Sequence, residues 1–118
     1  RMSLKLYHNP NCSKSRQGKK ILEDNNIEFE TKLYMKEPIS YSEITKIVNL
    51  FPENPMLLIR TKEKLFKELN IDTQTLNDKK EIIKLIQKYP KLMERPLLNS
   101  ENFTIIGRPP ENFKLILN

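Results

Sequence analysis

Residues 4–34 read LKLYHNPNCSKSRQGKKILEDNNIEFETKLY, and this stretch decides the fold class. Residues 5–7 predict a short strand, which the turn-forming residues 9–11 bring to an end. A thin apolar stripe predicts a helix from residue 12 or 13 to about residue 25, and alternating apolar residues predict a strand over 27–34. A strand, a helix and a strand within about 30 residues form a βαβ unit, so an α/β fold is expected.

The middle of the chain predicts a helical insertion over about residues 40–90. Residues 40–43 have capping-box spacing, and apolar residues at helical spacing follow in three groups. The groups are Ile44, Ile47, Val48 and Phe51, then Leu65, Phe66 and Leu69, then Ile82, Leu85, Ile86 and Tyr89. Each group predicts one helix, and the spacing is that of core packing.

The last part of the chain returns to strands. Residues 97–98 and 103–106 flank a polar stretch and predict a hairpin. Pro110 suits the first position of a helix, which is expected over about 111–117. The predicted order is therefore βαβ, helices, ββα.

Length and composition fit a single soluble domain spanning residues 1–118. The chain is 37% hydrophobic and 31% charged, and no apolar run approaches the length of a transmembrane helix. No apolar leader precedes the first strand, and a single cysteine cannot form an intramolecular disulfide, so we expect a cytoplasmic protein with no membrane partner. We also expect a monomer. The net charge of +6 favours anionic partners, but no nucleic-acid-binding motif accompanies it, so nucleic acid is not expected among them.

The only histidine and the only cysteine of the chain, His8 and Cys12, lie four residues apart. Cys12 falls at the predicted helix start, where unpaired backbone N–H groups and the helix dipole favour an anion. Ser15 could donate a hydrogen bond to its sulfur, and Lys14, Arg16 or His8 could add positive charge. Together these would lower the thiol pKa from about 8.5, which favours a nucleophilic thiolate. The alternative is an inert cysteine packed under the sheet.

Several kinds of cysteine site are excluded by the neighbouring residues. The phosphatase pattern C-x5-R requires arginine at the position of Gly18, and a C-x-x-C dithiol requires cysteine at the position of Ser15. One histidine and one cysteine are too few for a zinc site, so no metal is expected. What remains is a single thiol at a helix start, and any adduct that it forms must be resolved by an external thiol.

Four arginines, Arg16, Arg60, Arg95 and Arg108, fall at or near the boundaries of the predicted elements. Arginine is preferred where a planar oxyanion is bound through two hydrogen bonds at once. The simpler alternative is that each of them ends a secondary-structure element.

Four sequence blocks together resemble the glutaredoxin-dependent arsenate reductases. They are HNPNCSKSR at 8–16, LIR at 58–60, ERP at 94–96 and IGRPP at 106–110, and the closest likeness is to short arsenate-reductase-like members. The resemblance runs in order from Leu4 to about Leu117. It implies a single thioredoxin-like arsenate reductase domain over 1–118, with a mixed central sheet and the helical insertion at about 40–90.

The resemblance also implies a mechanism. Cys12 would be the nucleophile that attacks arsenic(V), with no bound cofactor, while glutathione acts as co-substrate and glutaredoxin reduces the mixed species. Arginines that converge on arsenate or a related oxyanion would be Arg60, Arg95 and Arg108. Residues that tune the thiolate would be His8 and Ser15, with Arg16 added from the charge argument above. A cis peptide bond is implied before Pro96.

A second family offers an alternative function. Transcription regulators of the Spx type share the thioredoxin-like fold that the resemblance implies. These regulators act by binding RNA polymerase, without enzymatic activity. They usually switch through C-x-x-C, and Ser15 removes the second cysteine of that pattern. Fold alone does not decide between the two functions.

Overall fold

The computed structural model describes residues 3–117, so Arg1, Met2 and Asn118 at the ends of the predicted 1–118 domain lie outside the described residues. It divides into two compact units. Arg1–Pro38 and Arg95–Asn118 form the sheet unit, and Ile39–Glu94 form the helical unit. The insertion predicted at about 40–90 lies inside the helical unit, and the single-domain assignment stays a prediction.

The sheet unit holds a four-stranded mixed sheet. Its elements are β1 (Lys5–Tyr7), α1 (Ser13–Asp24), β2 (Glu30–Lys32), β3 (Leu97–Asn99), β4 (Thr104–Ile106) and the 3-10 helix η4 (Pro110–Leu117). The strand order is β2-β1-β3-β4, with β1 parallel to β2 and antiparallel to β3, and β3 antiparallel to β4. In this register Leu6 lies opposite both Thr31 and Leu98. The α/β class with a mixed sheet is therefore confirmed.

Two predicted elements differ from those observed. The strand expected over 27–34 is limited to Glu30–Lys32, because β2 is an edge strand and β1 offers only three residues for pairing. The final helix is a 3-10 helix instead of an α-helix. In it the Asn112 side chain donates to the carbonyls of Ile106 and Arg108, and such bonds compete with helical hydrogen bonding.

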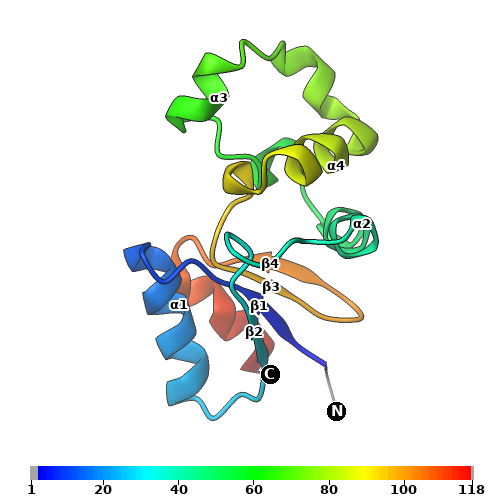
Figure 1. Cartoon of the computed structure of the whole chain (residues 1–118). Helices are drawn as coiled ribbons and strands as arrows, with labels where there is room; N and C mark the ends of the chain where they lie inside the picture. Colours follow the sequence, from blue (N-terminus) through cyan, green and yellow to red (C-terminus); the bar gives the residue numbers. More distant parts are fainter. Residues whose placement is uncertain (1–2, 118) are drawn as a thin grey trace. The chain divides into compact units, whose positions relative to one another are not determined.

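One face of the sheet carries the apolar core of this unit. Figure 1 shows α1 and η4 on the same face of the sheet, and residues of both helices and of the sheet meet there. The buried residues of this cluster are Leu4, Leu6, Leu22, Leu98 and Phe113. Leu4 and Leu6 are two residues apart, so the strand period directs both side chains to this face.

The two glycines of the chain let three segments approach one another closely. A Cβ on Gly18 of α1 would lie 2.7 Å from Cγ of Pro96, and one on Gly107 would lie 2.8 Å from the same atom. Both would also come within 2.8 Å of the Phe113 ring. The peptide bonds before Pro96 and Pro109 are cis, the first as the resemblance implies. Arg95 precedes Pro96 and Arg108 follows Gly107 in the sequence, so this close packing holds both arginines beside α1.

Gly107→Ala should destabilise the protein by about 1–3 kcal/mol, because the added methyl group forces apart atoms that are already in contact. Urea unfolding should show a lower midpoint with an unchanged slope. Lys114→Ala, at an exposed position on η4, is the control and should leave the midpoint unchanged. Equal midpoints for Gly107→Ala and the control would contradict the close contact.

The helical unit contains the three predicted helices. Its elements are α2 (Tyr41–Leu50), η1 (Pro55–Leu58), α3 (Lys64–Glu68), η2 (Thr73–Asn77), α4 (Lys79–Lys88) and η3 (Pro90–Leu92). The capping box is confirmed, since Ser40 Oγ accepts from the Glu43 N–H and Glu43 Oε1 accepts from the Ser40 N–H. None of the helices described within residues 3–117 combines the length and apolar character that crossing a membrane requires.

Candidate active site

Cys12 is the N-cap residue of α1 and is half-buried. Its own side chain makes no capping hydrogen bond to the helix, so it does not serve as a structural cap. The first turn of α1 contains no acidic residue, so no carboxylate neutralises the positive end of the helix dipole. The backbone N–H groups of Lys14 and Ser15 lower the pKa of the thiol, although neither forms a capping hydrogen bond with the sulfur. This start of α1 is therefore built to hold an anion at position 12.

The loop before Cys12 is held by polar contacts of its own. The Cys12 N–H donates to the Asn9 carbonyl at 3.0 Å. Ser15 Oγ accepts from the Asn9 N–H at 3.0 Å and shares a hydrogen bond of 2.7 Å with Nδ1 of His8. Arg16 Nη1 donates to the Pro10 carbonyl at 2.8 Å. The Ser15 hydroxyl therefore fixes the loop, and this residue reaches the sulfur through its backbone.

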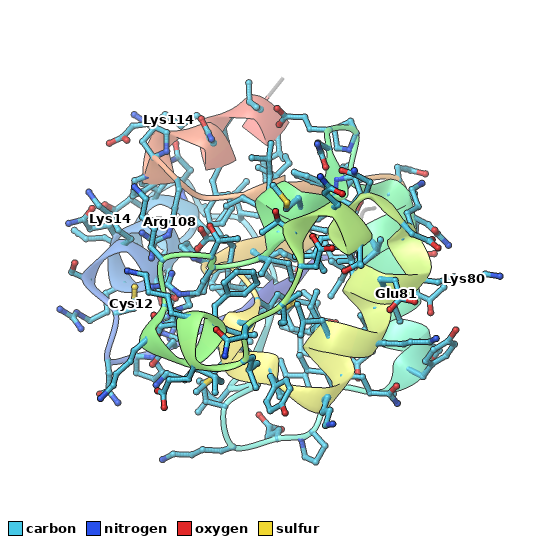
Figure 2. All side chains as sticks on the ribbon, turned by 90° about the horizontal axis from the view of Figure 1, so that it is seen from above. Cys12, Lys14, Lys80, Glu81, Arg108 and Lys114 are labelled. Atoms are coloured by element: carbon cyan, nitrogen blue, oxygen red, sulfur yellow. The ribbon has the colours of Figure 1, made fainter. Side chains whose placement is uncertain are left out.

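Two arginines from the end of the chain meet at the Cys12 sulfur. Arg108 donates from Nη2 to Sγ of Cys12 at 3.4 Å, and Figure 2 shows the two labelled side chains together. Its Nε donates to the Arg95 carbonyl at 2.8 Å, which orients the guanidinium plane. The Arg95 side chain also bonds to Cys12 and is itself only 8% exposed. The sulfur thus has two cationic donors.

The pKa of the Cys12 thiol is lowered from its ordinary value. Burial alone would raise this pKa, because it disfavours the charged form. The Ser15 N–H, the Arg95 side chain, the Arg108 charge and the Lys14 N–H outweigh burial. The lowered pKa increases the thiolate fraction at a given pH, which favours a nucleophilic role.

His8 and Arg16 are not among the main causes of the lowered pKa of Cys12 among the described residues, and their predicted tuning of the thiolate stays a prediction. Burial, with the charges of Lys19 and Arg16, lowers the pKa of His8 from 6.5, so the imidazole is neutral at pH 7 and adds no positive charge. Their contacts indicate that they position the loop.

Arg60 belongs to the helical unit and is held there by carboxylates. The Arg60 N–H donates to the Leu92 carbonyl at 2.7 Å, which aligns this segment with the one that carries Glu94. Its Nη1 lies 2.8 Å from Glu94 Oε1, and its Nη2 lies 3.6 Å from Glu63 Oε2. The structure therefore brings Arg95 and Arg108 to Cys12 within the sheet unit. Arg60 forms ion pairs within the helical unit, and its predicted contact with the oxyanion stays a prediction.

Arg60→Ala should destabilise the protein by about 1–3 kcal/mol, because it leaves two carboxylates that are only about one-fifth exposed without the guanidinium. Chemical unfolding measures the change. Lys84→Ala removes a well-exposed partner of Glu81 and is the control, with no change expected. If both variants unfolded at the same denaturant concentration, the Arg60 pairs would have no structural role.

Sequence reasoning missed Tyr34, whose side chain bonds to Arg95. Tyr34 lies at the end of the strand predicted from alternating apolar residues, and this pattern does not indicate a polar contact.

Within residues 3–117, no three His, Cys, Asp or Glu side chains lie close enough together to hold a metal ion.

The sequence of this chain is similar to a family model and to several known proteins. A family model described as the ArsC family matches residues 7–116. An arsenate reductase of Haemophilus influenzae is 38% identical over 117 residues, 98% of this chain and 100% of that protein. The global transcriptional regulator Spx of Listeria innocua is 30% identical over 112 residues, 95% of this chain and 85% of that protein.

The solved structures agree on the fold. The structure of an arsenate reductase from Vibrio cholerae matches with a TM-score of 0.86 and 34% identity, covering 98% of both chains. The fold is therefore thioredoxin-like, as expected.

Proposed function

Since this chain belongs to the ArsC family, we propose that it is an oxidoreductase that reduces arsenate to arsenite through the thiolate of Cys12. The observation that carries the proposal is the convergence of Arg95 and Arg108 on one half-buried sulfur. The names of several relatives point the same way.

The first step is nucleophilic attack by the Cys12 thiolate on arsenic(V). A sulfur–arsenic bond forms, and one arsenate oxygen leaves as water after protonation. Arg95 and Arg108, which donate to the sulfur in the free protein, are placed to donate to the arsenate oxygens as the negative charge moves from sulfur to oxygen. Such charge stabilisation by fixed donors is the main contribution that the residues of this site offer.

The reduction requires an external thiol, because the chain has no second cysteine. Glutathione is proposed to attack the arsenic bound to Cys12, and a second arsenate oxygen leaves as water. A glutaredoxin thiolate then attacks the glutathione sulfur, so that a disulfide forms, the bond between that sulfur and arsenic breaks, and its electron pair reduces arsenic(V) to arsenic(III). Water displaces Cys12 from arsenic, and arsenite is released. Overall, two thiol sulfurs are oxidised to one disulfide, and the two electrons convert arsenic(V) to arsenic(III). Cys12 is then a thiolate again and is ready for another cycle.

The direct test is a coupled assay with arsenate, glutathione, glutaredoxin, glutathione reductase and NADPH. Arsenate-dependent oxidation of NADPH is expected with the chain present, and arsenite should be detected as product. Omission of glutaredoxin should slow the reaction. Absence of any arsenate-dependent rate above that of the mixture without the chain would reject the proposal.

A regulator of the Spx type is the second candidate, and the similarity to the Listeria protein favours it. Such a chain would bind RNA polymerase without catalysis. Ser15 occupies the place where a C-x-x-C switch would carry its second cysteine. Capture of purified RNA polymerase, together with no activity in the coupled assay, would favour this alternative.

A further inference from the structure

Tyr34 is a deeply buried tyrosine just beyond the end of β2. Only 2% of its surface is exposed, and its ring packs edge-on against Tyr7, with 6.5 Å between the centroids and 62° between the ring planes. Tyr7 ends the neighbouring strand β1, so Tyr34 is anchored to the centre of the sheet. A tyrosine has only two side-chain torsions, and this packing fixes the position of its hydroxyl group.

Arg95 joins this tyrosine to the reactive sulfur. Its guanidinium makes side-chain hydrogen bonds to Tyr34 and to Cys12. Because Arg95 is 8% exposed, few water molecules can solvate its charge, and a buried cation needs hydrogen-bond acceptors around it. Burial would lower the pKa of Arg95, but Tyr34 and Cys12 raise it, so both are partners of the charged form.

We infer that Tyr34 is a positioning residue, whose hydroxyl group holds the Arg95 guanidinium in the orientation that donates to the Cys12 sulfur. The inference rests on the proposed function only in taking Cys12 as the nucleophile. A long arginine side chain has many rotamers, and a hydrogen bond from its guanidinium to a fixed acceptor reduces the number that it can adopt. Arg108 and the backbone N–H groups of Lys14 and Ser15 also act on the sulfur, so the loss of the Tyr34 hydroxyl group should remove only part of the stabilisation.

The test is the pH dependence of Cys12 alkylation by iodoacetamide, which needs no arsenate. Tyr34→Phe keeps the ring against Tyr7 and removes only the hydroxyl group. Partial loss of a hydrogen bond to a charged group should raise the thiol pKa by about half a unit, and this slows alkylation about threefold at pH values well below the pKa. Tyr89→Phe makes the same change in the helical unit and should leave the profile unchanged. Circular dichroism at the assay temperature checks that each variant is folded.

A double-mutant cycle shows whether Tyr34 acts through Arg95. In an Arg95→Ala background, Tyr34→Phe should cause no further shift of the thiol pKa. The same shift in both backgrounds, or no shift in either, would overturn the inference and leave the proposed function standing. An ordinary thiol pKa in the unmodified protein would overturn both. A Tyr34 effect in a chain without reductase activity would support the inference and reject the proposed function.

Discussion

Cys12→Ser is expected to abolish arsenate reduction, with kcat lowered about a thousandfold or more. A serine hydroxyl has nearly the same shape, but its oxygen stays protonated at neutral pH and forms no bond that glutathione can reduce. The lowered pKa of Cys12 arises from groups that stabilise an anion, and serine does not supply that anion. The coupled assay measures the loss, and arsenite production measured directly excludes an effect on the coupling enzymes.

The fold should survive this substitution, because Cys12 makes no capping bond that serine would break. Matching circular dichroism spectra are therefore the control. In the unmodified protein, alkylation should accelerate with rising pH as the thiol ionises, with a midpoint below the ordinary thiol value because the folded-state pKa is lowered. Retention of most of the turnover by Cys12→Ser would contradict the mechanism.

The helices and the first strand could be predicted because their signals are local. The capping box at Ser40, the helical spacing of Ile44 and Ile47, and the turn after Tyr7 all lie within a few residues of what they determine. The length of β2 depends on how many residues of β1 are available to pair with it, and the sequence of β2 alone does not show that number. The 3-10 form of η4 depends on where the Asn112 side chain finds its acceptors.

The candidate site was only partly predictable from the sequence. Cys12 stands out because a helix start and a lone thiol coincide in one short stretch. Arg108 lies 96 residues further along the chain, so no local pattern connects the two, and only the family resemblance suggested it. That resemblance says nothing about the neighbours of each arginine. The carboxylates around Arg60 and the phenol beside Arg95 emerged only from the folded chain.

Arg108→Ala is expected to lower kcat/KM about 100-fold to 1,000-fold, the usual effect of removing one donor to a developing oxyanion. Arg108→Lys should recover only part of this loss. Lysine restores the positive charge, but its single amino group cannot bond to the Arg95 carbonyl and the sulfur as the two nitrogens of Arg108 do. Steady-state kinetics in the coupled assay measure both variants.

The alkylation profile separates the two contributions of Arg108. Its charge lowers the pKa of Cys12, so Arg108→Ala should raise that pKa, whereas Arg108→Lys should raise it less. Lys20→Ala removes an exposed cation of α1 that is paired with Asp24, and it is the control for net charge. If Arg108→Lys had the full kcat/KM of the unmodified protein, a point charge would suffice. The planar geometry that the Arg95 carbonyl imposes on Arg108 would then have no part in catalysis.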